Sequence, residues 1–204
     1  MTNSFFTGAE ARLVADRYDF ARATTVVDVG GGNGHLLTAI VQSYPLVEGI
    51  LFDRPEVTRE AREQFASGGL SERCRAVVGD VFSAIPRGAD HYILNSVLRS
   101  CDNNCVARLL DACQNAMDEV STLLMITYQT RPGSNYRRSR DRREPALIEL
   151  GGAEHSEQEI CTLLTPADLR LEASIDTHSS MRILVCRKAN SQSVSPGSRS
   201  PRHR

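Results

Sequence analysis

The chain has 204 residues, of which 41% are hydrophobic and 24% are charged, and its formal net charge is −1. This length and balance predict one globular domain with no general attraction to nucleic acid or to anionic membranes. No apolar run approaches the ~20 residues that a membrane span needs, and the chain starts without a signal segment, so we expect a cytoplasmic protein.

The first half of the chain alternates between patterns typical of helices and patterns typical of buried strands. Apolar residues at helical spacing predict helices at residues 5–23, 35–44 and 54–70. Short β-branched runs predict strands at residues 24–30, 47–53 and 74–82. Pro45 ends the second of these helices, and the pair Gly68-Gly69 closes the third.

The second half continues this alternation and ends with two strands in succession. We predict further strands at residues 89–98 and 121–129, and further helices at residues 102–117 and 156–169. Asn103 or Asn104 is a candidate cap for the first of these helices. Ser156 and Glu159 have capping-box spacing at the start of the second. An antiparallel pair of strands is expected at residues 170–178 and 181–188.

Other parts of the sequence point to solvated segments and to reduced thiols. The basic block at residues 137–143 is typical of a solvated loop, and the Ser-, Pro- and Arg-rich residues 190–204 predict a disordered tail. The cysteines lack the CxxC spacing of zinc sites, so we expect reduced thiols and no metal site. These cysteines are Cys74, Cys101, Cys105, Cys113, Cys161 and Cys186.

The order of the elements predicts the fold. Strands that alternate with helices imply an α/β domain, here residues 1–189, with a doubly wound, mostly parallel, Rossmann-like sheet and an antiparallel strand at one edge. Ligands of such sheets bind beyond the carboxyl ends of the strands. Four segments should meet at that edge: residues 30–34, Asp53, residues 80–82 and residues 95–101.

The stretch VVDVGGGNGH, residues 26–35, ends the first predicted strand. Glycine tolerates positive φ and lets a ligand approach the backbone, although a plain tight turn would also account for these residues. A dinucleotide fingerprint would need a glycine at position 35, which is His35. Asp28 lies two residues before Gly30, where a carboxylate can face a cation but would repel a pyrophosphate. The loop is therefore expected to hold something other than a dinucleotide.

The segment VVDVGGGNGHLLTAIV resembles the S-adenosylmethionine-binding motif of class I methyltransferases. More narrowly, it is similar to the small-molecule O-methyltransferases of the caffeate and hydroxyneurosporene type. The similarity continues through GILFDRPEV, GLSERCRAVVGDVF and GADHYILNSVL, and it reappears in LGGAEHSEQEI. The resemblance implies that S-adenosylmethionine is the cofactor.

The resemblance also implies a role for each cofactor residue. The glycine loop, with Gly30, Gly32 and Gly34, would cradle the methionine end. Asp28 would organise this loop or meet the ammonium group, and Asp53 would accept both ribose hydroxyls. The cofactor set is completed by Asp80, Val81 and Phe82, which would flank the adenine, and by Asn95, which stands where the family usually has Lys.

The catalytic motif departs from the family pattern. In the family a His removes the proton of the substrate hydroxyl as the oxygen attacks the methyl group. Here LNSVLRSCDNN places Arg99 at that position, and an arginine cannot act as a base at neutral pH. Of the two family glutamates that bracket the His, one falls at Glu154 and the other near Tyr128. The altered motif makes Arg99 and Glu154 the candidate catalytic residues.

Several roles stay open for this region. His91 or His155 is a candidate substitute base, or the substrate is already ionised and needs only orientation. Arg99 would suit an acidic substrate, since a guanidinium holds a carboxylate bidentately, or it forms a structural ion pair.

The resulting prediction is an S-adenosylmethionine-dependent O-methyltransferase that acts on a small molecule, in secondary metabolism. The alternatives are a cofactor-binding homologue that does not transfer methyl, of the hydroxylase, decarboxylase or pericyclase kind, or a non-catalytic partner subunit. Relatives carry a helical dimerisation domain before the catalytic one, whereas this sequence starts just before the catalytic domain. We therefore expect a homodimer or pairing with a complete homologue.

Overall fold

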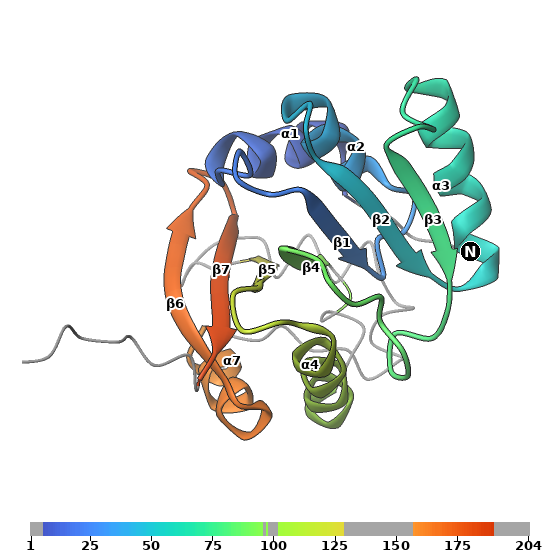
Figure 1. The fold of residues 1–204 in the computed structure, drawn as a ribbon. Coiled ribbons are helices and arrows are strands. Elements are labelled where there is room, and N and C mark those ends of the chain that lie inside the picture. The colour runs from blue at the N-terminus through green and yellow to red at the C-terminus, as the bar shows by residue number, and fades with distance from the viewer. Residues whose placement is uncertain (1–5, 96, 98–101, 129–156, 190–204) are drawn as a thin grey trace, which may run out of the picture.

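The computed structural model describes residues 6–95, 97, 102–128 and 157–189. In these residues, strands form one seven-stranded sheet in the order β3-β2-β1-β4-β5-β7-β6 (Figure 1). Strands β1 to β5 pair in parallel, and β7 pairs antiparallel with both β5 and β6. The predicted fold class is thus confirmed. The strands are β1 Thr25–Val29, β2 Glu48–Asp53, β3 Cys74–Val78, β4 His91–Asn95, β5 Thr122–Tyr128, β6 Leu169–Asp176 and β7 Met181–Lys188.

Helices cover both faces of the sheet. Helices α1, α2 and α3 lie on one face, and α4 and α7 lie on the other (Figure 1). A short 3₁₀ turn, η2, follows α7 and leads into β6. The bounds are α1 Gly8–Arg17, α2 His35–Ser43, α3 Pro55–Ser67, α4 Asn103–Ala116, α7 Glu157–Leu164 and η2 Thr165–Ala167.

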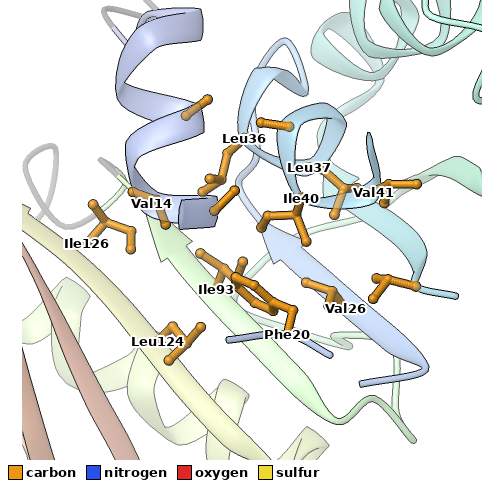
Figure 2. Close-up of a cluster of buried hydrophobic side chains, with 14 of the residues drawn as sticks. Val14, Phe20, Val26, Leu36, Leu37, Ile40, Val41, Ile93, Leu124 and Ile126 are labelled. Atoms are coloured by element: carbon orange, nitrogen blue, oxygen red, sulfur yellow. The ribbon is translucent and has the colours of Figure 1, made fainter. Parts of the chain in front are cut away.

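Alternation along the strands divides the core into two layers. Successive side chains of a strand point to opposite faces, so Val26 of β1 packs in the layer under α1 and α2 while Val27 packs in the layer under α4 and α7. Figure 2 shows the first layer, where Phe20, Leu36 and Ile93 pack together with side chains of α1, α2 and β5. This double burial holds the strand ends, and the loops that follow them, in fixed positions.

Some predicted boundaries need correction. The cap of α4 is Asp102, whose Oδ1 accepts a hydrogen bond from the Cys105 amide at 2.8 Å, and not Asn103 or Asn104. An aspartate suits that position because it satisfies a free amide and adds a negative charge at the helix N-terminus. Helix α1 is shorter than the predicted 5–23, since a capping box between Thr7 and Glu10 starts it and the extended backbone of Tyr18 ends it.

The cysteine prediction holds only in part. Cys74, Cys113, Cys161 and Cys186 are free thiols, whereas Cys105 is disulfide-bonded, which corrects the expectation of reduced thiols at that position. The predicted Ser156 cap, the basic block at residues 137–143 and the tail at residues 190–204 lie outside the described residues.

Arg73 closes the C-terminal end of α2 from the turn before β3. Its Nη1 donates to the carbonyl oxygens of Val41 at 2.9 Å and Pro45 at 3.1 Å. Arg73→Met should lower the free energy of unfolding by about 1–3 kcal/mol, because these carbonyls lose a charged donor. Urea denaturation measures the loss. The control is Arg75→Met, at an exposed position of β3, which should stay within about 0.5 kcal/mol of the wild type; equal losses would contradict the assignment.

Candidate functional site

The carboxyl ends of β1, β2, β3 and β4 form one edge of the sheet, and the predicted ligand residues lie along it. The Gly30 amide donates to the Phe52 carbonyl at 2.8 Å, which joins the glycine loop to β2. The Gly79 amide donates to the Asp53 carbonyl at 3.0 Å, which joins the turn after β3 to the end of β2. Asn95 ends β4, next to β1. The structure thus brings together segments from four parts of the sequence.

The glycine loop between β1 and α2 depends on its lack of side chains. Gly30, Gly32 and Gly34 have φ values of 69°, 63° and 81°, in the region that L side chains rarely adopt. A Cβ at Gly31 would lie 2.6 Å from the Asp28 carboxyl, and a Cβ at Gly34 would lie 2.9 Å from the Phe65 ring. The loop therefore packs closely against the sheet and α3. Its glycines, just before the start of α2, carry no side chains that would keep a ligand at a distance.

Asp28 lies beneath this loop, in the middle of the sheet. Its side chain is 0% exposed, and neither carboxyl oxygen has a hydrogen-bond partner among the described residues. Burial, with a smaller contribution from the charge of Asp53, raises the pKa of Asp28 to about 7. A buried carboxyl without partners is costly unless a cation or a donor compensates it. This orphaned group fits a ligand that brings a positive charge to the loop.

Asp53 is held in one orientation at the end of β2. Its Oδ2 accepts from the Gly32 amide at 3.0 Å, and its Oδ1 accepts from the Arg54 amide at 2.7 Å. Its side chain is buried, at 8% exposure. Each carboxylate oxygen has two lone pairs, so one on each stays available. The geometry suits an acceptor for two neighbouring hydroxyl groups.

The turn after β3 places Asp80, Val81 and Phe82 beside the same edge. The Asp80 carboxylate accepts from the Phe82 amide at 3.0 Å, which fixes the turn. The guanidinium carbon of Arg108, on α4, lies 4.8 Å from the centre of the Phe82 ring. Sequence reasoning missed Arg108, because the helical pattern identified only the apolar face of α4. The contact orients Phe82 by a cation–π interaction.

The candidate catalytic residues Arg99 and Glu154, and also His155, lie outside the described residues. His91 is described, and it starts β4 opposite Val26, at the amino end of the sheet. Its ring packs against those of Tyr18 and Phe20, and burial lowers its pKa. The hypothesis that His91 substitutes for the base is therefore wrong, since the glycine loop is at the opposite end of the strands.

The end of β5 carries Tyr128, near which the second family glutamate was expected. Its hydroxyl donates to Oε1 of Glu10 at 3.2 Å, so a carboxylate from α1 lies beside this strand end.

Within the described ranges, no group of three or more His, Cys, Asp or Glu side chains could hold a metal ion. No helix of the described part is long and apolar enough to cross a membrane.

Known proteins resemble this chain in sequence and in fold. The family model of the O-methyltransferase domain matches residues 7–170. The mitomycin biosynthesis 6-O-methyltransferase of Streptomyces lavendulae is 38% identical over 187 residues, which are 88% of this chain and 52% of that protein. The solved structure of the mitomycin 7-O-methyltransferase MmcR has a TM-score of 0.82 at 38% identity and covers 89% of this chain and 54% of that one.

A third similarity is to a structure with bound ligands. The O-methyltransferase NcsB1 from neocarzinostatin biosynthesis was solved in complex with S-adenosylmethionine and 2-hydroxy-5-methyl naphthoic acid. It has a TM-score of 0.74 at 30% identity, and the match covers 86% of this chain and 52% of that one. The chain thus spans about half the length of the relatives it matches.

Proposed function

This chain belongs to the O-methyltransferase domain family, and from that premise we propose that it binds S-adenosylmethionine and methylates a hydroxyl oxygen of a small molecule in secondary metabolism. The observation that carries the proposal is the buried Asp28 carboxyl under the glycine loop, to which none of the described residues donates a hydrogen bond. A dinucleotide would bring a pyrophosphate to this loop, whereas S-adenosylmethionine brings an ammonium and a sulfonium. The charge of the site therefore favours the sulfonium cofactor.

Each of the site residues would contact a different part of the cofactor. The loop with Gly30, Gly32 and Gly34 would hold the methionine end above Asp28, and the free lone pairs of Asp53 would accept the ribose hydroxyls. Asp80 would bind the adenine amino group directly or through water. An adenine that stacks on Phe82 would take the ring face opposite Arg108. The remaining contacts would come from Val81 and Asn95.

The cofactor supplies an electrophilic methyl group, and the chain must supply orientation and a nucleophilic oxygen. Arg99 cannot remove the substrate proton, so we propose that the substrate oxygen is already ionised or that Arg99 holds an acidic substrate group. By the resemblance, Glu154 would take the part of one of the two family glutamates that bracket the His. Because most of the similar proteins are methyltransferases, methyl transfer is preferred here to the non-transferring and regulatory alternatives.

A turnover experiment tests this function. The purified chain is incubated with S-adenosylmethionine and a panel of hydroxylated aromatic acids, and S-adenosylhomocysteine and methylated product are both quantified. Equal amounts of the two support methyl transfer. Product without S-adenosylhomocysteine would contradict it in favour of other chemistry, and cofactor binding without either would point to a partner subunit.

Asp53→Ala should weaken S-adenosylmethionine binding by about 1–3 kcal/mol, because the ribose hydroxyls lose their acceptor. Isothermal titration calorimetry measures the change in Kd. Asp16→Ala, at an exposed position of α1, is the control and should leave the affinity unchanged. An unchanged Kd for Asp53→Ala would remove Asp53 from the cofactor site.

Arg99→His should create or raise methylation of a neutral phenolic substrate if the base is what the chain lacks. A general base contributes about 10²–10⁴-fold to such a reaction, so even a partial gain is measurable. The readout is the initial rate of methylated product at neutral pH. No gain would mean that the substrate pocket, and not the base alone, differs from the family pattern.

We further propose that residues 1–189 act as one catalytic domain in the cytoplasm and that the chain forms a homodimer or pairs with a complete homologue. The proposal rests on the dimerisation domain that the resemblance implies for relatives. Multi-angle light scattering of the purified chain gives its mass in solution. A concentration-independent monomer that turns over substrate alone would contradict it.

A further inference from the structure

The two buried carboxyl groups at the carboxyl ends of the parallel strands, Asp28 and Asp53, have very different surroundings. Asp53 accepts hydrogen bonds from two backbone amides, those of Gly32 and Arg54. Asp28 is enclosed by the sheet and by Gly31, and no described residue donates a hydrogen bond to it. Of two neighbouring carboxyl groups, the one without donors keeps a proton more readily.

A charged group on the neighbouring strand contributes to the raised pKa of Asp28. Asp53, on β2, is the charged group of the described residues that acts on it, and it acts in the same direction as burial. Together they raise the pKa of Asp28 to about 7, so the group titrates near neutral pH in the ligand-free protein. A positive charge placed on the loop above would reverse this balance, because it favours the carboxylate.

We propose that Asp28 holds a proton in the ligand-free protein below neutral pH and releases it to solvent when the sulfonium cofactor binds, so that the site distinguishes S-adenosylmethionine from S-adenosylhomocysteine by charge. This inference rests on the proposed function, since it takes S-adenosylmethionine as the ligand. Binding converts the Asp28 carboxylic acid to the carboxylate and frees one proton. After methyl transfer the sulfur is a neutral thioether, so the ligand keeps its ammonium group but loses one of the two positive charges that favour the Asp28 carboxylate.

The consequence is a pH-dependent preference between cofactor and product. As the pH rises from 6 to 8, Asp28 becomes ionised in the free protein, and S-adenosylmethionine no longer has to displace its proton. Its affinity should rise by about tenfold over this range, as expected for the release of one proton from a group with a pKa of about 7. The affinity of S-adenosylhomocysteine should rise less, because it lacks the sulfonium charge. Exchange of product for fresh cofactor is thereby favoured above pH 7.

Calorimetry in buffers of different ionisation enthalpy tests the inference, since it counts the protons released on binding. The wild type and Asp28→Asn are titrated with S-adenosylmethionine and with S-adenosylhomocysteine between pH 6 and 9. For the wild type we expect proton release with S-adenosylmethionine that exceeds release by Asp28→Asn at pH 6 and 7 and that disappears by pH 9. Subtraction of the variant removes any protons that the ligand itself loses.

A second measurement does not depend on the variant. Infrared spectroscopy of the wild type at pH 6 should show a protonated carboxylic acid band that S-adenosylmethionine removes and S-adenosylhomocysteine removes less. Asp16→Asn, on the exposed side of α1, is the control and should release as many protons as the wild type.

The outcomes separate the two proposals. Binding with equal proton release by the wild type and Asp28→Asn, or with no change in the infrared band, would overturn the inference and leave the proposed function standing. No heat of binding with either ligand at any pH would overturn the proposed function, and the inference with it.

Discussion

Replacing Asp28 with asparagine should raise the free energy of unfolding of the ligand-free protein by about 4 kcal/mol at pH 8 and have little effect at pH 4. The pKa of Asp28 is raised from 3.8 to about 7 by burial and by Asp53. A group whose pKa is higher in the folded state stabilises the fold fully below its unfolded pKa, and that contribution is lost as the pH rises through 7. About three pKa units at 1.36 kcal/mol each give the figure.

Urea denaturation of both proteins at pH 4, 6 and 8 measures this difference. The control is Asp90→Asn, which should act in the opposite direction at pH 8. Burial alone would raise the pKa of Asp90, but hydrogen bonds from Thr25 and Thr24 outweigh it and hold the pKa below its usual value. The stabilisation by Asp90 is therefore present above pH 4 and lost in acid. If Asp28→Asn is no more stable than the wild type at pH 8, the Asp28 carboxylate must be stabilised by a hydrogen-bond donor or a cation in the ligand-free protein.

The sheet was predictable because strand signals and helix signals alternate along the chain. The composition of β7 fits its position inside the sheet, because the residues ILVC at its centre are all buried. The outer strand β6 carries charged residues instead. The end of α1 was not predictable from spacing. Phe20 and Ala23 are buried, at 0% and 3% exposure, but they belong to the turn that follows the helix. Apolar residues therefore do not by themselves mark a helix end.

The set of segments that meet at the cofactor site was predictable from the parallel sheet, because the carboxyl ends of parallel strands lie together. The electrostatics of the site were not predictable in this way. In the part of the chain that the structure describes, nothing donates to Asp28 while two amides donate to Asp53, and this depends on the path of the glycine loop, which no sequence pattern predicts. The contact of Arg108 with Phe82 depends on the packing of α4 against the turn after β3. These features arise from tertiary packing between segments that are distant in the sequence.

Gly34→Ala should destabilise the protein by about 2–5 kcal/mol and abolish measurable cofactor binding. Gly34 is the N-terminal cap of α2 and has a φ of 81°, where an alanine costs about 1–2 kcal/mol. Its new Cβ would also lie 2.9 Å from the Phe65 ring, and overpacking of a core adds about 1–3 kcal/mol. Either the α2 terminus or α3 must move, and the loop between β1 and α2 moves with them.

The matched control is Gly69→Ala, which separates backbone strain from crowding. Gly69 has a φ of 67°, but nothing lies within 4 Å of a Cβ at that position. Its substitution should cost about 1–2 kcal/mol, the backbone term alone, and should leave the Kd for S-adenosylmethionine unchanged. Thermal unfolding and calorimetry of both variants measure the two effects. Equal losses of stability would show that the Phe65 ring yields, and that contact with α3 does not hold the loop in place.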